Sequence, residues 1–240
     1  MKIALLGYGR MGREVEQVAL AGGHEIVLKT DISSQDGFNR QTAPQCDVAI
    51  EFTGPEAAAD TIIKAITLGL PVVSGSTGWL TRYDEVVKLC VERDGSFIHS
   101  PNFSIGVNIL SRLNSELARI MMRLPEYRPE IGETHHASKK DTPSGTAIML
   151  AEQIVSEHGG YTGWRRAGDR PGQGTVPVIS VREGTVPGSH TVTWKSDHDI
   201  ISLSHEAINR SGFAHGAIMA AEYISTRRGV FTMADILNII

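Results

Sequence analysis

The chain has 240 residues, of which 41% are hydrophobic, so it can bury a sizeable core in one large domain or two modest ones. A net charge of -4 without any Lys/Arg-rich stripe argues against a nucleic-acid partner, and no segment approaches the roughly 18 apolar residues that a membrane span needs. The two cysteines, Cys46 and Cys90, are far apart and lack metal or redox spacing, so we expect a cytoplasmic protein without disulfides or a membrane partner.

In the first hundred residues, short apolar runs alternate with longer amphipathic patterns. The expected strands are 2–6, 25–30, 47–53, 71–74 and 96–99, and the expected helices are 11–21, 55–68 and 83–92. Strands that alternate with helices of roughly 10–15 residues indicate right-handed crossovers and a parallel sheet. This half of the chain is therefore predicted to be a doubly wound α/β domain.

After residue 103 the pattern changes. We expect a helix over 107–123, an extended stretch over 127–135 and a helix over 145–157, followed by three β-rich runs at 176–182, 190–195 and 200–205. Short connections with Gly or Asp between these runs are typical of antiparallel strands. Residues 159–175, rich in Gly and Arg, are predicted to be a mobile surface loop. A final helix over 213–226 and the tail are expected to pack on the first domain.

A glycine-rich turn directly follows the first strand and opens the first helix. Its residues, in the G-x-G-x-x-G pattern, are Gly7, Tyr8, Gly9, Arg10, Met11 and Gly12. In this context the first glycine permits the turn, the second lets the backbone approach a pyrophosphate, and the third lets the helix pack close to the strand. Amides at a helix start also favour phosphate. The turn therefore predicts a dinucleotide cofactor bound by a Rossmann-like sheet.

The acidic residue expected after such a turn is Asp31, which follows Gly12 by 19 residues and can bind the ribose hydroxyls. Asp31 favours NADH, whereas Arg10 and Lys29 could accept a 2′-phosphate. The choice between NADH and NADPH therefore stays open.

Two further turns come after the fourth and fifth predicted strands. They are Gly75-Ser76-Thr77-Gly78 and Ser100-Pro101-Asn102-Phe103. Ligands of open α/β sheets bind beyond the carboxyl ends of the strands, where small residues let backbone and hydroxyl groups approach the nicotinamide end of a cofactor. Either turn alone could be an ordinary loop, but two on consecutive strands favour a functional role.

The segment from Glu133 to Thr146 holds the densest group of chemically active residues. His135, His136 and Lys139 offer proton donors and cations within one short loop. Ser144 is a plausible N-cap for the next helix, and the amides of Gly145 and Thr146 would form an anion site at its start. One loop would thus combine a general acid, a cation and a carboxylate site.

Simpler readings of these residues remain. The paired histidines could be metal ligands, but the sequence has no Cys nearby and no H-E-x-x-H pattern, so we predict no metal site there. A solvated polar loop is possible, the scattered histidines at 99, 190, 198, 205 and 215 are expected to be structural, and Arg210 could bind a substrate carboxylate or pair with a surface acid.

With these motifs in place, the sequence resembles the dihydrodipicolinate reductase family, also called 4-hydroxy-tetrahydrodipicolinate reductases, of the diaminopimelate and lysine pathway. The most specific match is E-x-H-H-x-x-K-x-D-x-P-S-G-T-A, found here from Glu133 to Ala147. Supporting matches span nearly the whole chain and include 9–12, 52–56, 75–78, 102–108 and 210–217. Ser76 stands where a threonine is common in the family, and this difference keeps the hydroxyl group.

The resemblance implies an NADH- or NADPH-dependent reductase of a small anionic dicarboxylate, 4-hydroxy-tetrahydrodipicolinate, and typically a homotetramer. It implies a dinucleotide-binding domain over 1–104, completed by 210–240, and an α+β substrate-binding and oligomerisation domain over 105–209 with a mainly antiparallel sheet. The implied catalytic residues are His135 and Lys139. The implied substrate ligands are His136, Lys139, Ser144, Gly145, Thr146 and Arg210. The implied cofactor site comprises the glycine turn, Asp31, Thr53, Gly75, Ser76, Thr77, Ser100, Pro101, Asn102 and Phe103.

Two other functions fit part of the sequence. A homoserine or aspartate dehydrogenase would share the glycine turn but not the His-His-x-x-Lys stretch. A nucleotide-sensing module without catalysis would bind the cofactor but would have little use for two histidines and a lysine beside an anion site.

Overall fold

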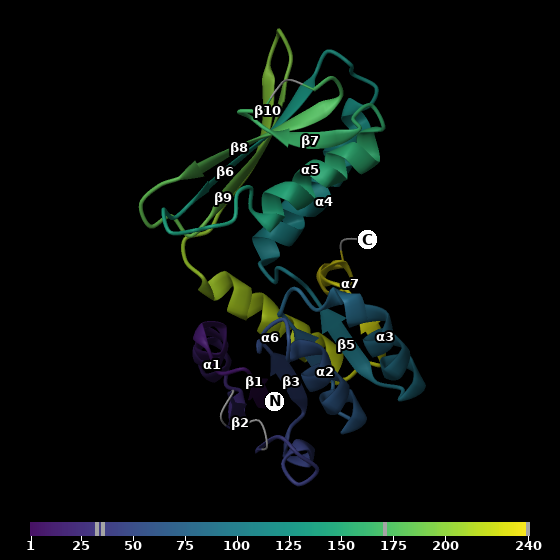
Figure 1. Cartoon of the computed structure of the whole chain (residues 1–240). Coiled ribbons are helices and arrows are strands. Elements are labelled where there is room, and N and C mark those ends of the chain that lie inside the picture. The colour runs from purple at the N-terminus through teal and green to yellow at the C-terminus, as the bar shows by residue number, and fades with distance from the viewer. Residues whose placement is uncertain (32–33, 35–36, 170–171, 239–240) are drawn as a thin grey trace. The chain divides into compact units, whose positions relative to one another are not determined.

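The computed structural model describes residues 1–31, 34, 37–169 and 172–238. The chain divides into two compact units (Figure 1). The first consists of Met1–Ile105 together with Arg210–Ile240, and the second of Gly106–Asn209. Among the described residues, no helix is both long and apolar enough to cross a membrane.

The first unit is built on a six-stranded sheet in which every neighbouring pair is parallel. Its strands are β1 (Lys2–Leu6), β2 (Glu25–Thr30), β3 (Val48–Glu51), β4 (Val72–Ser74), β5 (Ser96–His99) and β11 (Gly229–Phe231), in the order β11-β5-β4-β3-β1-β2. Its helices are α1 (Arg10–Ala21), α2 (Ala58–Thr67), α3 (Tyr83–Glu92), α6 (Ser211–Ser225) and α7 (Met233–Leu237), with short 3₁₀ helices at Ala43–Gln45 and Leu80–Arg82. The predicted doubly wound parallel sheet is confirmed.

Alternate residues of each strand feed two separate cores, one on each face of this sheet. Ala4 and Leu6 of β1 join the core under α2 and α3, whereas Ile3 and Leu5 join the core under α1 and α6. Because successive side chains of a strand point to opposite faces, a strand buried on both sides needs a continuous apolar run. This requirement explains the continuous apolar run of β1 from Ile3 to Leu6.

The second unit contains a five-stranded mixed sheet in the order β10-β9-β6-β8-β7. Its strands are β6 (Arg128–His135), β7 (Gly163–Arg166), β8 (Thr175–Arg182), β9 (Ser189–Lys195) and β10 (Ile200–Glu206). Its helices, α4 (Ile105–Met121) and α5 (Gly145–His158), share one apolar core with the sheet, which includes Leu110, Ile131, Leu150 and Trp194. Antiparallel pairing holds for β10, β9 and β6, but β8 is parallel to both β6 and β7.

Two expectations for this unit were wrong. The predicted surface loop at 159–175 contains β7, which lies at the edge of the sheet. An edge strand needs no strict apolar alternation, so the Gly and Arg residues of β7 gave no strand pattern in the sequence. Residues 170 and 171 of that loop lie outside the described part. The short connection between the runs at 176–182 and 190–195 favoured direct antiparallel pairing, but β6 lies between these two strands. The connection crosses the end of β6, where Glu183 N donates to His135 O at 2.8 Å.

The tail adds a strand that the sequence did not reveal. β11 pairs in parallel with β5 and closes one edge of the first sheet, although only three residues, Gly229–Phe231, take part. So short a run carries too little pattern to be recognised without its partner strand.

Candidate active site

The three glycines of the first turn serve different purposes. Gly7 has φ +98°, and a Cβ there would lie 2.4 Å from the carbonyl of Phe52. A Cβ on Gly12 would lie 2.5 Å from the carbonyl oxygen of Gly7. A Cβ on Gly9, in contrast, would meet nothing within 4 Å. The fold itself therefore requires Gly7 and Gly12, whereas the bare backbone at Gly9 leaves room for a phosphate group.

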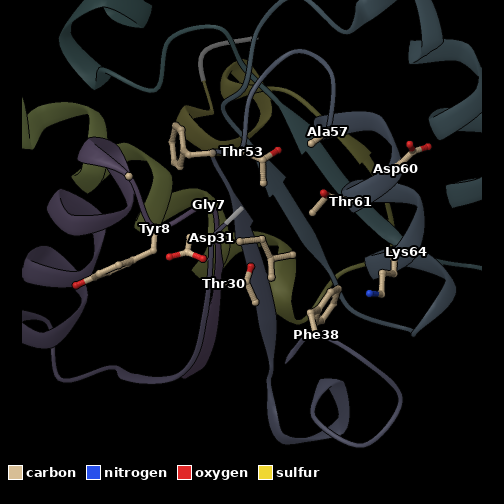
Figure 2. A pocket seen from close by; sticks show the side chains of 13 residues that line it. Gly7, Tyr8, Thr30, Asp31, Phe38, Thr53, Ala57, Asp60, Thr61 and Lys64 are labelled. Atoms are coloured by element: carbon tan, nitrogen blue, oxygen red, sulfur yellow. The ribbon is translucent and has the colours of Figure 1, made fainter. Parts of the chain in front are cut away.

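A pocket of about 490 Å³ opens at the carboxyl end of β1, β2 and β3 (Figure 2). It is lined by Leu6, Gly7, Tyr8, Gly9, Thr30, Asp31, Phe38, Phe52, Thr53, Ala57, Asp60, Thr61 and Lys64. Five predicted cofactor residues thus meet in one cavity: Gly7, Tyr8, Gly9, Asp31 and Thr53. The other predicted residues, Arg10 to Gly12, Gly75 to Thr77 and Ser100 to Phe103, belong to the same unit but do not line this pocket.

The charges around this pocket bear on cofactor choice. Asp31 accepts a hydrogen bond from Ser34 Oγ at 2.9 Å and lines the cavity. Lys29, considered above as a phosphate ligand, is paired with Glu16, and its ammonium lies 4.8 Å from the centre of the Tyr8 ring. A cation not anticipated from the sequence, Lys64, lines the pocket instead (Figure 2).

A buried carboxylate organises the sheet edge beside the pocket. Glu51, the last residue of β3, has no exposed surface. One oxygen, Oε1, accepts hydrogen bonds of 2.6 Å from Thr53 N, Thr53 Oγ1 and Ser76 Oγ, and Oε2 accepts one of 2.6 Å from Ser74 Oγ. Ser76 Oγ also accepts from Gly54 N at 3.0 Å, so its hydroxyl is engaged within the protein. Glu51 thereby fixes the backbone that carries Thr53.

In the second unit, strand register brings a polar cluster together at one end of the sheet. Along β6 the buried face passes from Ile131 to Glu133 and then His135. The neighbour opposite Glu133 on β9 is His190, and the neighbour of His135 on β8 is Arg182. Residues directly opposite each other on one face lie close enough to interact. The strands thus place an acid, two imidazoles and a guanidinium at the end of an otherwise apolar core.

Glu133 is the centre of this cluster and has no exposed side-chain surface. Its Oε1 lies 3.0 Å from Arg182 Nη2 and accepts from Ser144 N at 3.0 Å, while its Oε2 lies 3.2 Å from His135 Nδ1. Burial acts to raise the pKa of Glu133, but hydrogen bonds from Ser144 and Arg182 outweigh it, so the pKa is lowered. Glu133 is therefore an anion near neutral pH.

Glu133, His135 and His190 form the one group in the described part of the chain whose donor atoms could surround a metal ion, all lying within 4.8 Å of one another. However, Arg182 already pairs with the carboxylate of Glu133, and Ser144 donates to both of its oxygens. A cation there would have to displace a guanidinium, so the donor set fits an ion pair better than a metal.

The two histidines of the cluster are held neutral. Burial lowers the pKa of His135, and the positive charges of Lys139 and Arg182 act in the same direction, against Glu133. Burial, with His135 nearby, lowers the pKa of His190 to about 4. Lys139, in contrast, keeps 22% of its side chain exposed and lies 2.7 Å from Asp141, whose pKa it lowers. A neutral imidazole at the end of β6 is thus followed, four residues later, by an ammonium in the next loop.

The start of α5 has the geometry of an anion site. Ser144 caps the helix, accepting from Ala147 N at 3.2 Å through its side chain. A Cβ on Gly145 would meet nothing within 4 Å, so a ligand can reach the backbone there. The Nδ1 atom of His136 is hydrogen-bonded to Ser138 Oγ at 2.8 Å. Thr146 lies in the first turn of α5. All predicted substrate ligands except Arg210 lie in this unit, between the end of β6 and the first turn of α5, whereas Arg210 precedes α6 in the first unit.

Several members of these clusters had no predicted functional role. Glu51 and Arg182 were assigned none, Glu133 was matched only as part of the motif, and His190 was expected to be structural. Arg182 and His190 become visible only through the register of β8 and β9 against β6. The buried acid at position 51 could have been suspected, because a charged residue ending a run of apolar strand residues requires partners.

Comparison with known proteins agrees with the motif at residues 133–147. Two family models match, "Dihydrodipicolinate reductase, N-terminus" over residues 1–103 and "Dihydrodipicolinate reductase, C-terminus" over 106–237. The chain is 43% identical to the 4-hydroxy-tetrahydrodipicolinate reductase of Christiangramia forsetii, over 99% of this chain and 98% of that protein. It is 37% identical to the enzyme of that name from Rickettsia rickettsii, over 96% of each.

Among solved structures, a dipicolinate-bound dihydrodipicolinate reductase from Paenisporosarcina sp. TG-14 covers 100% of this chain and 99% of its own. Its TM-score is 0.81 at 20% sequence identity, so the fold is shared.

Proposed function

Because the chain belongs to the dihydrodipicolinate reductase family, we propose that it reduces 4-hydroxy-tetrahydrodipicolinate to tetrahydrodipicolinate, with His135 and Lys139 controlling the proton that accompanies hydride transfer. The observation that supports these roles is the segment from the end of β6 to the start of α5, which carries a neutral imidazole, an ammonium and an accessible helix start. The reaction belongs to lysine and diaminopimelate biosynthesis, a cytoplasmic process.

The cofactor, NADH or NADPH, supplies the hydride. In the first unit, the open backbone at Gly9 would hold the pyrophosphate, and the carboxylate of Asp31, which lines the pocket, would bind the ribose hydroxyls. Thr53, held by Glu51, lines the same pocket. A glycine turn and an acid that line one pocket support the proposal that it binds a dinucleotide.

The substrate carries two carboxylates, and the second unit offers matching groups. The start of α5 at Gly145 and Thr146 binds one carboxylate through backbone amides, and the positive helix end favours the negative charge. Lys139 and His136 add charge and hydrogen-bond donors, and the Ser144 side chain keeps the helix start in place. These contacts orient the ring of the substrate.

The proton comes from Lys139 in this mechanism. Burial keeps His135 neutral near pH 7, so it does not hold the extra proton of an imidazolium, whereas the Lys139 ammonium carries one. Reduction replaces the 4-hydroxyl group by hydrogen: the hydroxyl leaves with a ring proton as water, which gives a conjugated imine, and hydride from a bound cofactor would then add to this conjugated system. The negative charge that builds there is neutralised by a proton from a positioned acid. His135 acts as the neutral hydrogen-bonding partner that orients the accepting atom.

The test supplies freshly generated 4-hydroxy-tetrahydrodipicolinate with NADH or NADPH and follows the loss of nicotinamide absorbance. His135→Ala and Lys139→Ala are expected to lower kcat by about 10²–10⁴-fold, the usual range for a lost acid or base. His198→Ala and Lys140→Ala, both at exposed positions, are the matched controls. Near-normal turnover in both loop variants would remove these residues from the mechanism.

The assembly is proposed to be a homotetramer joined through the sheet of the second unit. Ile179 and Val181 of β8 alternate with the core-facing residues of that strand and remain 37% and 41% exposed. A sheet face without a helix cover that carries such residues favours association. Sedimentation equilibrium of the purified protein tests this, and a monomer at micromolar concentration would exclude it.

A further inference from the structure

We propose that Arg182 is a positioning residue that holds the strand carrying His135 and the loop carrying Lys139 in one arrangement. The inference rests on the proposed roles of those two groups. Arg182 lies at the end of β8, on the strand that runs parallel to β6, and the register makes it the neighbour of His135.

One nitrogen of the guanidinium joins two separate segments. Arg182 Nη2 lies 3.0 Å from Glu133 Oε1 and donates to the carbonyl oxygen of Asp141 at 2.6 Å. Glu133 stands two residues before His135 on the same strand face, and Asp141 pairs with Lys139 at 2.7 Å. Arg182 therefore links strand β6, which carries His135, to the loop that carries Lys139.

The second link runs through Glu133 to the substrate site. Ser144 N donates to both carboxylate oxygens of Glu133, at 3.0 and 3.2 Å, and Ser144 caps α5. With His135 and His190 neutral, Arg182 is the one permanent cation within ion-pair distance of Glu133 in the described part of the chain. A fully buried carboxylate without that partner is costly, so Arg182 also secures the start of α5.

The charges around His135 make this role measurable. The titratable groups that face His135 are Glu133 on β6, Lys139 and Asp141 in the loop, Arg182 on β8 and His190 on β9. Replacing Arg182 by a neutral residue removes a cation and leaves Glu133 uncompensated. Both changes favour the imidazolium, so the pKa of His135 should rise.

The experiment compares Arg182→Gln and Arg182→Lys with the wild type, and uses Arg128→Gln at an exposed position of β6 as the matched control. Arg182→Gln is expected to lower kcat by about 10–100-fold, as a misplaced catalytic group does, with the KM for NADH unchanged within about twofold. The acid limb of the kcat profile should move upward by at least about 0.5 pH unit.

The lysine variant separates charge from geometry. A lysine retains the positive charge but lacks the planar fork, so Arg182→Lys should keep the acid limb close to that of the wild type and still lose kcat. If Arg182→Gln does not fold, the lysine variant alone decides between the outcomes. Wild-type kcat in Arg182→Lys, or in Arg182→Gln with an unmoved acid limb, would overturn the proposal.

A measurement without turnover distinguishes this proposal from the proposed function. The pKa of His135 can be followed by NMR of imidazole-labelled protein, with the signal assigned through His135→Gln. A raised pKa in Arg182→Gln supports the link even if the enzyme fails to turn over the expected substrate. If the pKa of His135 is unchanged in Arg182→Gln while the wild type turns over the expected substrate, the positioning role of Arg182 is refuted and the proposed function is not.

Discussion

Replacing Glu51 by glutamine tests whether a buried carboxylate prepares the cofactor pocket. The substitution keeps the shape of the side chain but changes what it can accept. Three hydrogen-bond donors converge on Oε1 and one on Oε2. An amide satisfies them best with its carbonyl oxygen toward Thr53 and Ser76 and its NH₂ group toward Ser74, whose hydroxyl must then turn to accept.

The magnitude follows from the loss of charge on the acceptor. Hydrogen bonds to a charged group contribute about 1.5–3 kcal/mol and neutral ones about 0.5–1.5 kcal/mol, so each of the three bonds to Oε1 weakens by about 1 kcal/mol. The free energy of unfolding of Glu51→Gln should therefore fall by about 3 kcal/mol. Because Thr53 lines the pocket, NADH should bind about tenfold more weakly, which corresponds to about 1.4 kcal/mol.

Urea unfolding followed by circular dichroism gives the first quantity, and titration of nicotinamide fluorescence gives the second. Glu92→Gln, at an exposed position near the end of α3, is the matched control and should change neither. The reasoning is refuted if Glu51→Gln unfolds within about 0.5 kcal/mol of the wild type, the scatter of ordinary surface substitutions.

Three other predictions follow from the same structure. Because burial lowers the pKa of His190 to about 4, the unfolded chain takes up a proton between about pH 6.5 and 4 that the folded protein excludes. The free energy of unfolding should therefore fall by roughly 3 kcal/mol from this group as the pH drops across that window. Urea unfolding measured at several pH values should show that the free energy of unfolding of His190→Asn depends less steeply on pH than that of the wild type. Gly12→Ala should destabilise the fold, since its Cβ would meet the carbonyl of Gly7, whereas Gly9→Ala should leave thermal unfolding unchanged and weaken NADH binding; equal effects in both assays would contradict the different roles of the two glycines. Asp31→Ser should weaken NADH more than NADPH, because only NADH offers a free 2′-hydroxyl, and equal losses in fluorescence titrations would argue against a ribose contact.

The sequence alone determined the local features of this protein. The alternation of apolar strands and helices determined the parallel sheet of the first unit, and the G-x-G-x-x-G pattern determined the turn at Gly7. The segment from Glu133 to Ala147 determined the family. These features depend on backbone conformation and side-chain chemistry within a few residues, so their pattern can be read without knowing what lies beside them.

The tertiary structure decided which distant residues became neighbours. β7 and β11 form because partner strands, β8 and β5, supply their hydrogen bonds. Their own short sequences carry too little pattern to predict a strand. Arg182 reaches Glu133 because β8 pairs in parallel with β6 rather than with β9, and a slip of one residue would turn its side chain to the opposite face. Register is a property of two strands together, and for that reason Arg182 and His190 could be identified as neighbours of His135 only in the folded chain.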